Sequence, residues 1–275
     1  MVLRRILKTY DLPLISIVGI VIGFFICTTN LQIEIGEYFI GLFHFSYILH
    51  IIILSELIIN NKLFRSYNLL YLNNGILIYL IINYFNNHGQ IYFNICALSE
   101  LKYSIPIIIY YFVVSKFMEF NKNSIKETRK PQLIKPLIYF FIIGFLTIVF
   151  FRISQFILLE KGVPNEERSL IIFNVEVHHL ISGYFGLLLL LPFIVYSSRK
   201  RFRKVKSNHL NNIIKLISFV LLSFMIDQST YFLFLDLDDL SYFSPTSLYG
   251  SILLLLIIII YIYLKKTYDS NKLRK

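Results

Sequence analysis

The residues best suited to chemistry are histidines and charged side chains that stand inside long apolar stretches. His178 and His179 are adjacent and follow Glu176, while Arg152 and Asp227 each interrupt a separate apolar stretch. Imidazole and carboxylate groups can transfer protons or bind a metal ion, and arginine can hold an anionic group such as a phosphate. These residue types therefore point to acid–base or metal chemistry.

Two chemical interpretations of these residues stay open. In one, a divalent metal such as zinc is bound by His178, His179 and Asp227, with His44 or Glu176 as a further ligand. In the other, a histidine and Asp227 form a metal-free acid–base pair, and Arg152 holds the anionic group of a substrate. The predicted catalytic residues are His178, His179, Asp227 and Arg152.

A structural interpretation and a transport interpretation compete with the chemical ones. Histidine and Asp227 could neutralise each other while Arg152 pairs with Glu176, which would fix helix packing without catalysis. A path for a small solute or ion would use the same polar groups and would extend to His50 and Glu56. Intramembrane ionisable groups favour function in general, but their types do not choose among these interpretations.

The composition explains why such groups would be costly, since the chain is suited to lipid. Of its 275 residues, 56% are hydrophobic and only 16% are charged, with a mean hydropathy of +0.66. Soluble domains carry roughly 25% charged residues. The net charge of +11 does not indicate a nucleic-acid partner, because the basic residues form short clusters between apolar runs. The predicted fold is an all-α, polytopic transmembrane bundle that forms one domain, residues 1–275.

Hydropathy predicts eight spans, which must position the polar residues. They lie near 12–29, 37–59, 69–86, 98–119, 133–158, 169–197, 212–235 and 246–264. Basic clusters, such as the run 199–206, fall on one side if the spans alternate, and most acidic loop residues fall on the other. We therefore expect both termini in the cytoplasm and a location in the inner (plasma) membrane of a bacterium.

Several polar residues are expected at similar depth in the outer half of the membrane. If 169–197 is a helix, then Glu176, His179, Gly183 and Gly186 share one face. Small residues on that face would let a neighbouring helix approach closely. Asp227 lies at a comparable depth, Arg152 lies near the outer end of its span, and His44 lies about a third of the way into the second span. We expect His179 and Asp227 to lie within direct or one-water reach, with Arg152 beside the same cavity.

The last two-fifths of the chain resemble a group of bacterial and archaeal integral membrane proteins. That group has an arginine at the end of one span, an HHxxxG segment in the next and an aspartate in another, followed by a Tyr–aromatic–Ser segment. The matching parts here are Arg152, His178–Gly183, Asp227 and Tyr242–Ser247. This chain has Gln228 where the group tends to have glutamate, so a second carboxylate ligand is absent there. The resemblance supports the site and implies no particular reaction.

The leading functional expectation is a membrane enzyme that acts on a lipid or lipid-linked substrate at the outer leaflet. The alternatives are a small-solute or ion permease and a non-catalytic membrane assembly or structural protein. The lipid bilayer is the one partner that composition implies directly. A tightly packed cluster without a cavity would favour the structural alternative, whereas a continuous polar path would favour transport.

Overall fold

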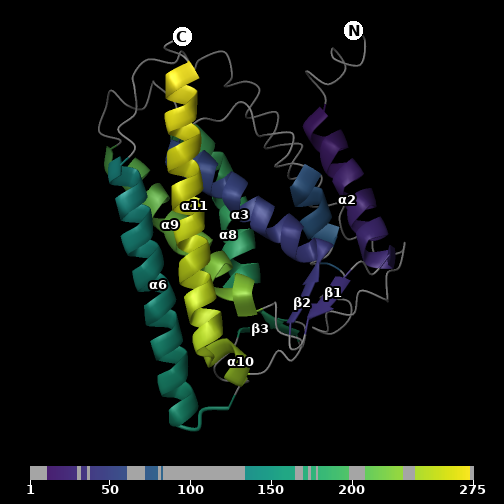
Figure 1. Ribbon diagram of the computed structural model, residues 1–275, viewed down its shortest axis with the longest axis vertical. Helices are drawn as coiled ribbons and strands as arrows, with labels where there is room; N and C mark the ends of the chain where they lie inside the picture. Colours follow the sequence, from purple (N-terminus) through teal and green to yellow (C-terminus); the bar gives the residue numbers. More distant parts are fainter. Residues whose placement is uncertain are drawn as a thin grey trace.

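The computed structural model describes about three fifths of the chain. The described residues are 11–29, 32–35, 38–60, 72–79, 82, 134–164, 170–172, 175–177, 179–197, 208–231 and 239–272. Within these ranges the fold is a helical bundle with two short β-hairpins (Figure 1). The helical architecture expected from the sequence is thus present in the described part, whereas the hairpins were not expected.

Among the described residues, three helices are long and apolar enough to cross a membrane. They are α6 (Ile134–Glu160), α9 (Asn208–Tyr231) and α11 (Pro245–Lys272), with apolar windows of mean hydropathy 2.3, 1.6 and 2.4. Three shorter apolar helices accompany them: α2 (Asp11–Thr29), α3 (Leu42–Asn60) and α8 (His179–Ser197). Residues 72–79 are also helical, and the short helix α10 (Asp239–Phe243) leads into α11.

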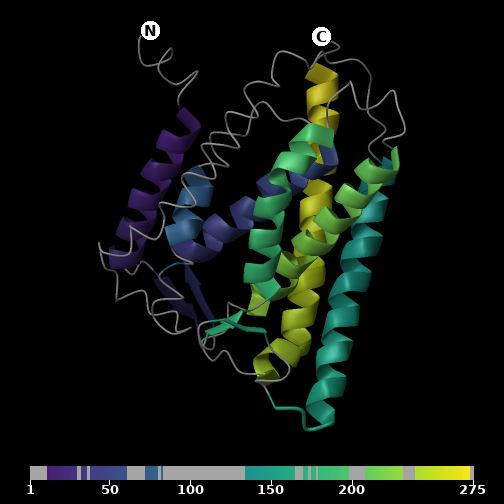
Figure 2. The ribbon, with the colours of Figure 1, turned by 180° about the vertical axis from the view of Figure 1, so that it is seen from behind.

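Helix α9 is the centre of the bundle. It packs against α3 and α8 on one side and against α6 and α11 on the other (Figure 2). Of its apolar window 44% is buried, against 28% for both α6 and α11. Side chains on α9 therefore contact most of the other described helices, so polar groups there can reach several neighbours at once.

The two ends of the bundle differ in structure. The hairpins and α10 gather at one end, called here the hairpin end, whereas α2 begins and α11 ends at the opposite end (Figure 1). Helices α6 and α11 run antiparallel, side by side, along the length of the bundle. The first and last described helices therefore begin and end, respectively, at the same end of the bundle.

Glycines permit the closest helix crossings. A Cβ atom on Gly183 of α8 would lie only 2.6 Å from the carbonyl oxygen of Leu221 on α9. Likewise Gly19 of α2 faces Gly75, and a side chain on either would collide with the backbone of the partner helix. Small residues allow such crossings in membrane helices, as the sequence predicted for Gly183 and Gly186.

The sixth predicted span is wrong in its first residues. Strands β3 (Leu170–Ile172) and β4 (Val175–Val177) pair antiparallel, and α8 begins only at His179. Four of these six strand residues are isoleucine or valine, whose branched side chains favour strands over helices. Glu176 therefore lies in a strand and shares no helix face with His179.

The second predicted span also begins too early. Strands β1 (Gln32–Ile35) and β2 (Tyr38–Gly41) form the other hairpin, and α3 begins at Leu42 instead of residue 37. The segment Gln–Ile–Glu–Ile alternates polar and apolar residues with a period of two, which is a strand pattern. His44 consequently lies in the first turn of α3 and not a third of the way along a span.

The other predicted spans agree with the described helices to different degrees. Helices α2 and α6 match the first and fifth spans to within two residues. Helix α11 begins one residue before the eighth span and ends eight residues after it, and α9 begins and ends four residues before the predicted seventh. Residues 72–79 lie inside the third predicted span. The fourth span, 98–119, lies outside the described residues.

Candidate functional site

The main polar cluster is built around Arg152 in the half of α6 nearest the hairpin end. Its Nε donates a hydrogen bond to Oδ1 of Asp227 at 2.7 Å, and its Nη1 donates to the backbone oxygen of Tyr242 at 2.6 Å. Its Nη2 donates to the backbone oxygen of Asp227 at 3.1 Å and to Oγ of Ser247 at 3.0 Å. Every nitrogen of the guanidinium group thus has an acceptor within the protein.

Asp227 is also bonded through both carboxylate oxygens. Oδ1 accepts from Arg152, and Oδ2 accepts from the hydroxyl of Tyr242 at 2.6 Å. The Tyr242 ring also lies against the cation, with the Arg152 Cζ atom 4.5 Å from its centroid. The side chains of Arg152 and Asp227 are only 7% and 3% exposed. The arrangement is a neutral, fully bonded ion pair inside the bundle.

The start of α11 supplies further oxygen atoms to this cluster. Ser251 donates to the backbone oxygen of Asp227 at 2.7 Å, and Thr230 donates to the backbone oxygen of Ser247 at 2.8 Å. Gly250 makes the crossing possible, because a Cβ there would lie 2.6 Å from the Thr230 methyl group. The cluster therefore ties α6, α9, α10 and α11 together.

Burial and charge also fix the protonation of Tyr242, which lies in α10 outside the long apolar spans. Burial is the main cause that raises the pKa of its hydroxyl well above 10.0, and the neighbouring Asp227 carboxylate raises it further. The hydroxyl therefore keeps its proton at physiological pH and remains a donor to Asp227.

His179 lies close to the cluster but its ring packs among aromatic side chains. Its ring centroid is 5.3 Å from that of Phe151, which adjoins Arg152, and 5.6 Å from that of Phe224, one turn before Asp227. His179 thus lies beside the helix segments that carry Arg152 and Asp227, although it opens its own helix. Both carboxylate oxygens of Asp227 accept from other groups, Arg152 and Tyr242, and the expected direct or one-water reach between His179 and Asp227 stays a prediction.

The other predicted site residues do not join the cluster within the described part. His178 lies outside the described residues, and so does the side chain of Glu176. The structural interpretation paired Arg152 with Glu176, whereas the acid beside Arg152 is Asp227. A catalytic role for His178, His179, Asp227 and Arg152 stays a prediction.

The residues present around Asp227 do not suit a metal ion. No group of three histidine, cysteine, aspartate or glutamate side chains gathers among the described residues. Asp227 lies beside a guanidinium cation that already neutralises it, and His44 is buried in the first turn of α3. A metal cation would have to displace Arg152 in order to bind this carboxylate.

A second group of buried polar residues lies between α3, residues 72–79 and α8. Oγ of Ser46 donates to Asn73 at 2.6 Å, and the hydroxyl of Tyr184 donates to Asn74 at 3.2 Å. The imidazole of His50 lies beside the Tyr184 ring, with centroids 5.4 Å apart, and is only 2% exposed. Among the described residues, its Nδ1 has no hydrogen-bond partner. This group is the main polar feature of the core away from Arg152.

Glu56 pairs with a lysine at the end of the bundle opposite the hairpins. Nζ of Lys265 lies 2.6 Å from Oε2 of Glu56, with side-chain exposures of 36% and 16%. The bond links α3 to the end of α11, which the sequence gave no reason to expect. Glu56, which the transport interpretation placed on a solute path, is thus paired with a lysine in the structure.

Sequence reasoning named Tyr242 and Ser247 through the resemblance but gave them no contact with Arg152 or Asp227, and it did not name Ser251. Ser247 and Ser251 are four residues apart on one helix face, at the start of an otherwise apolar run, and that spacing was an available signal. The contact between Tyr242 and Asp227 could not be predicted from spacing, because it depends on how α10 folds back. Comparison of the chain with family models, with curated proteins and with solved structures gives no match.

Proposed function

We propose that the chain is a polytopic protein of the plasma membrane with both termini in the cytoplasm. Support comes from the three long apolar helices, from the basic clusters between apolar runs and from the common end at which α2 begins and α11 ends. A reporter fused after Lys206 should then report a cytoplasmic location, and one inserted near Pro164 an external one. The same signal from both positions would contradict the proposed topology.

Within that membrane protein, we propose that the Arg152 cluster has a structural and non-catalytic function. The supporting observation is the complete bonding of the ion pair, since every guanidinium nitrogen and both Asp227 oxygens have partners inside the protein. A catalytic group needs a position that a substrate can reach, and neither buried side chain offers one to solvent. The chain is thus proposed as a membrane assembly or structural protein.

The test separates folding from chemistry by replacing the pair with apolar residues. Removing one partner of a buried ion pair costs about 3–5 kcal/mol, whereas replacing both with apolar residues of similar volume is often neutral. We expect Arg152→Met and Asp227→Leu to lower protein abundance singly and the double variant to recover it. The double variant should also complement any phenotype of a strain that lacks the protein.

The outcomes distinguish the two roles directly. A double variant that accumulates and complements supports the structural role, because the charged groups are then dispensable. A double variant that accumulates without complementing would contradict it and would assign chemistry to Arg152 or Asp227.

A small-solute or ion permease is the second candidate, supported by the polar group around His50. Polar side chains from three helices meet there inside an apolar core, and intramembrane polar groups often mark solute pathways. Purified protein in sealed vesicles should then move protons or small solutes, and His50→Phe should reduce that flux. Equal leakage from vesicles with and without the protein would remove this candidate.

A further inference from the structure

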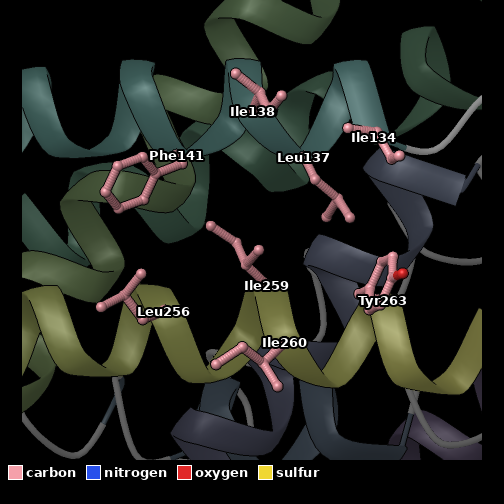
Figure 3. Close-up of a pocket in the computed structure, with 8 residues that line it drawn as sticks. All are labelled: Ile134, Leu137, Ile138, Phe141, Leu256, Ile259, Ile260 and Tyr263. Atoms are coloured by element: carbon pink, nitrogen blue, oxygen red, sulfur yellow. The ribbon is translucent and has the colours of Figure 1, made fainter.

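An open apolar groove lies between α6 and α11 at the end of the bundle opposite the hairpins. Figure 3 shows Leu137 of α6 and Ile259 of α11 projecting into the space between the two helices. The groove encloses about 430 Å³, within the range of roughly 300–1,000 Å³ that small-molecule sites occupy. Its position is distant along α6 from Arg152, so it belongs to neither polar cluster.

The lining of the groove is hydrocarbon almost throughout. Ile134, Ile138 and Ile260 form its rim and are 62%, 51% and 55% exposed. Such a surface excludes a polar solute as an occupant, because no charged side chain lines it. In a membrane, the surrounding material is acyl chain, which matches this lining.

Lysines adjoin the groove at the end that the proposed topology places at the cytoplasmic surface. Lys135 is exposed and lies three residues before Ile138, so it neighbours this rim residue on the surface of α6. Lys266 lies three residues after Tyr263 and so continues the groove face of α11 toward its end. Lysine stems can extend along apolar surface and hold their ammonium groups at headgroup level.

We propose that this groove binds an acyl chain of an anionic phospholipid, with the phosphate-bearing headgroup held between Lys135 and Lys266. The charge of the lysines is what makes the site selective, since the apolar lining fits an acyl chain of any phospholipid. The cytoplasmic leaflet supplies anionic lipids at the level of these lysines. The proposal rests on the membrane topology proposed above.

The absence of tryptophan from the chain allows a site-specific fluorescence test. Ile260→Trp would place a single reporter on the groove rim, whereas Ile257→Trp would place one on an exposed face of α11 that does not line the groove. Each variant is reconstituted in vesicles with brominated phosphatidylglycerol or brominated phosphatidylcholine, and quenching gives the relative affinity for the two lipids at each position.

Each lysine near an anionic surface contributes about a fivefold preference, so for the two lysines we expect a preference for phosphatidylglycerol of about 25-fold at the Ile260→Trp reporter. The Ile257→Trp reporter should show a ratio near one. Adding Lys135→Gln and Lys266→Gln to the groove reporter should bring its ratio toward one. Salt should do the same, because the Debye length falls from about 10 Å at 0.1 M to about 3 Å at 1 M.

Three results would overturn the proposal: a ratio near one at the groove, equal preference at both reporters, or an unchanged ratio after the lysine substitutions and in high salt. Failure of the underlying topology looks different. If α11 does not cross the membrane, neither reporter is quenched by phosphatidylcholine, whose acyl chains would quench both in a spanning helix.

Discussion

Replacing Tyr242 with phenylalanine removes one hydroxyl from the cluster and keeps the ring over Arg152. Oδ2 of Asp227 then loses its donor at 2.6 Å, while Oδ1 keeps the bond from Arg152. A hydrogen bond to a charged group contributes about 1.5–3 kcal/mol, so we expect Tyr242→Phe to lower the free energy of unfolding by that amount. The matched control is Tyr249→Phe, because Tyr249 is 69% exposed and should change stability by less than about 0.5 kcal/mol.

The assay is unfolding of the purified protein in mixed detergent micelles, followed by circular dichroism. Equal stabilities of Tyr242→Phe and Tyr249→Phe would refute the reasoning, because they would show that Asp227 does not depend on the Tyr242 hydroxyl. A loss far above the expected range would also count against it. Such a loss would mean that the substitution had displaced the aromatic ring as well as removing the hydroxyl.

The same hydroxyl predicts a dependence on alkaline pH. Its pKa is raised in the folded protein, so the folded state binds the proton more tightly than the unfolded state does, for which the value is near 10.0. The stability contributed by Tyr242 is therefore complete below pH 10 and is lost as the pH rises above it, by at most about 1.4 kcal/mol per pH unit. The difference in unfolding free energy between the native protein and Tyr242→Phe should be constant up to pH 10 and then decrease. A difference that grows above pH 10 would contradict the predicted direction of the effect.

Two further predictions concern helix contacts away from the cluster. Gly183→Ala should destabilise the protein by about 1–3 kcal/mol in the same assay, because the new methyl group meets the backbone oxygen of Leu221. Gly186→Ala is the control and should cost less, because its methyl group meets only the flexible side chain of Leu221. Equal losses of stability in the two variants would contradict this prediction. Glu56→Gln should lower the free energy of unfolding by less than about 1 kcal/mol, because the side chain of Lys265 is 36% exposed, and this loss should become smaller in high salt. A larger loss that does not depend on salt would contradict a solvent-screened ion pair.

Hydropathy was sufficient to predict the long helices but not where the shorter ones begin. Helix α6 runs from Ile134 to Glu160, against a predicted 133–158, because a continuous apolar run of that length has few alternatives in lipid. The apolar segments before α3 and α8 are short and rich in β-branched residues, and they pair as hairpins instead. Hydropathy is similar for an apolar strand and an apolar helix, so it does not separate the two.

Two members of the cluster, Arg152 and Asp227, were predictable, whereas the pairing between them was not. Arg152 and Asp227 were chosen correctly as polar residues that must find partners, because an unpaired charge in the membrane is costly. The partner of Asp227 was expected to be His179, because the two residues were expected at similar depth and small residues beside His179 would permit close approach. Pairing depends instead on the order of helices around α9, which places α6 and α11 beside Asp227 and which no residue pattern in the chain encodes locally.

Polar and apolar residues are distributed unequally over the three long helices, in the way expected of helices that are surrounded by lipid. The most buried of the three long helices, α9, has the lowest mean hydropathy, and its buried residues include Ser218, Ser223 and Asp227. Its serines satisfy their hydroxyls within the helix, since Ser218 donates to the oxygen of Ile214 at 2.7 Å and Ser223 to that of Phe219 at 2.6 Å.

The outer helices carry the opposite pattern. Leu146 and Phe150 of α6 are 59% and 66% exposed, and Leu253 and Ile260 of α11 are 57% and 55% exposed. In water, this surface would far exceed the apolar patches that soluble monomers expose. In a bilayer it costs nothing, whereas each polar group has to turn inward and find a partner. Such a requirement would account for the Arg152 cluster, which holds four elements in one register through groups that the interior of a bilayer does not accommodate.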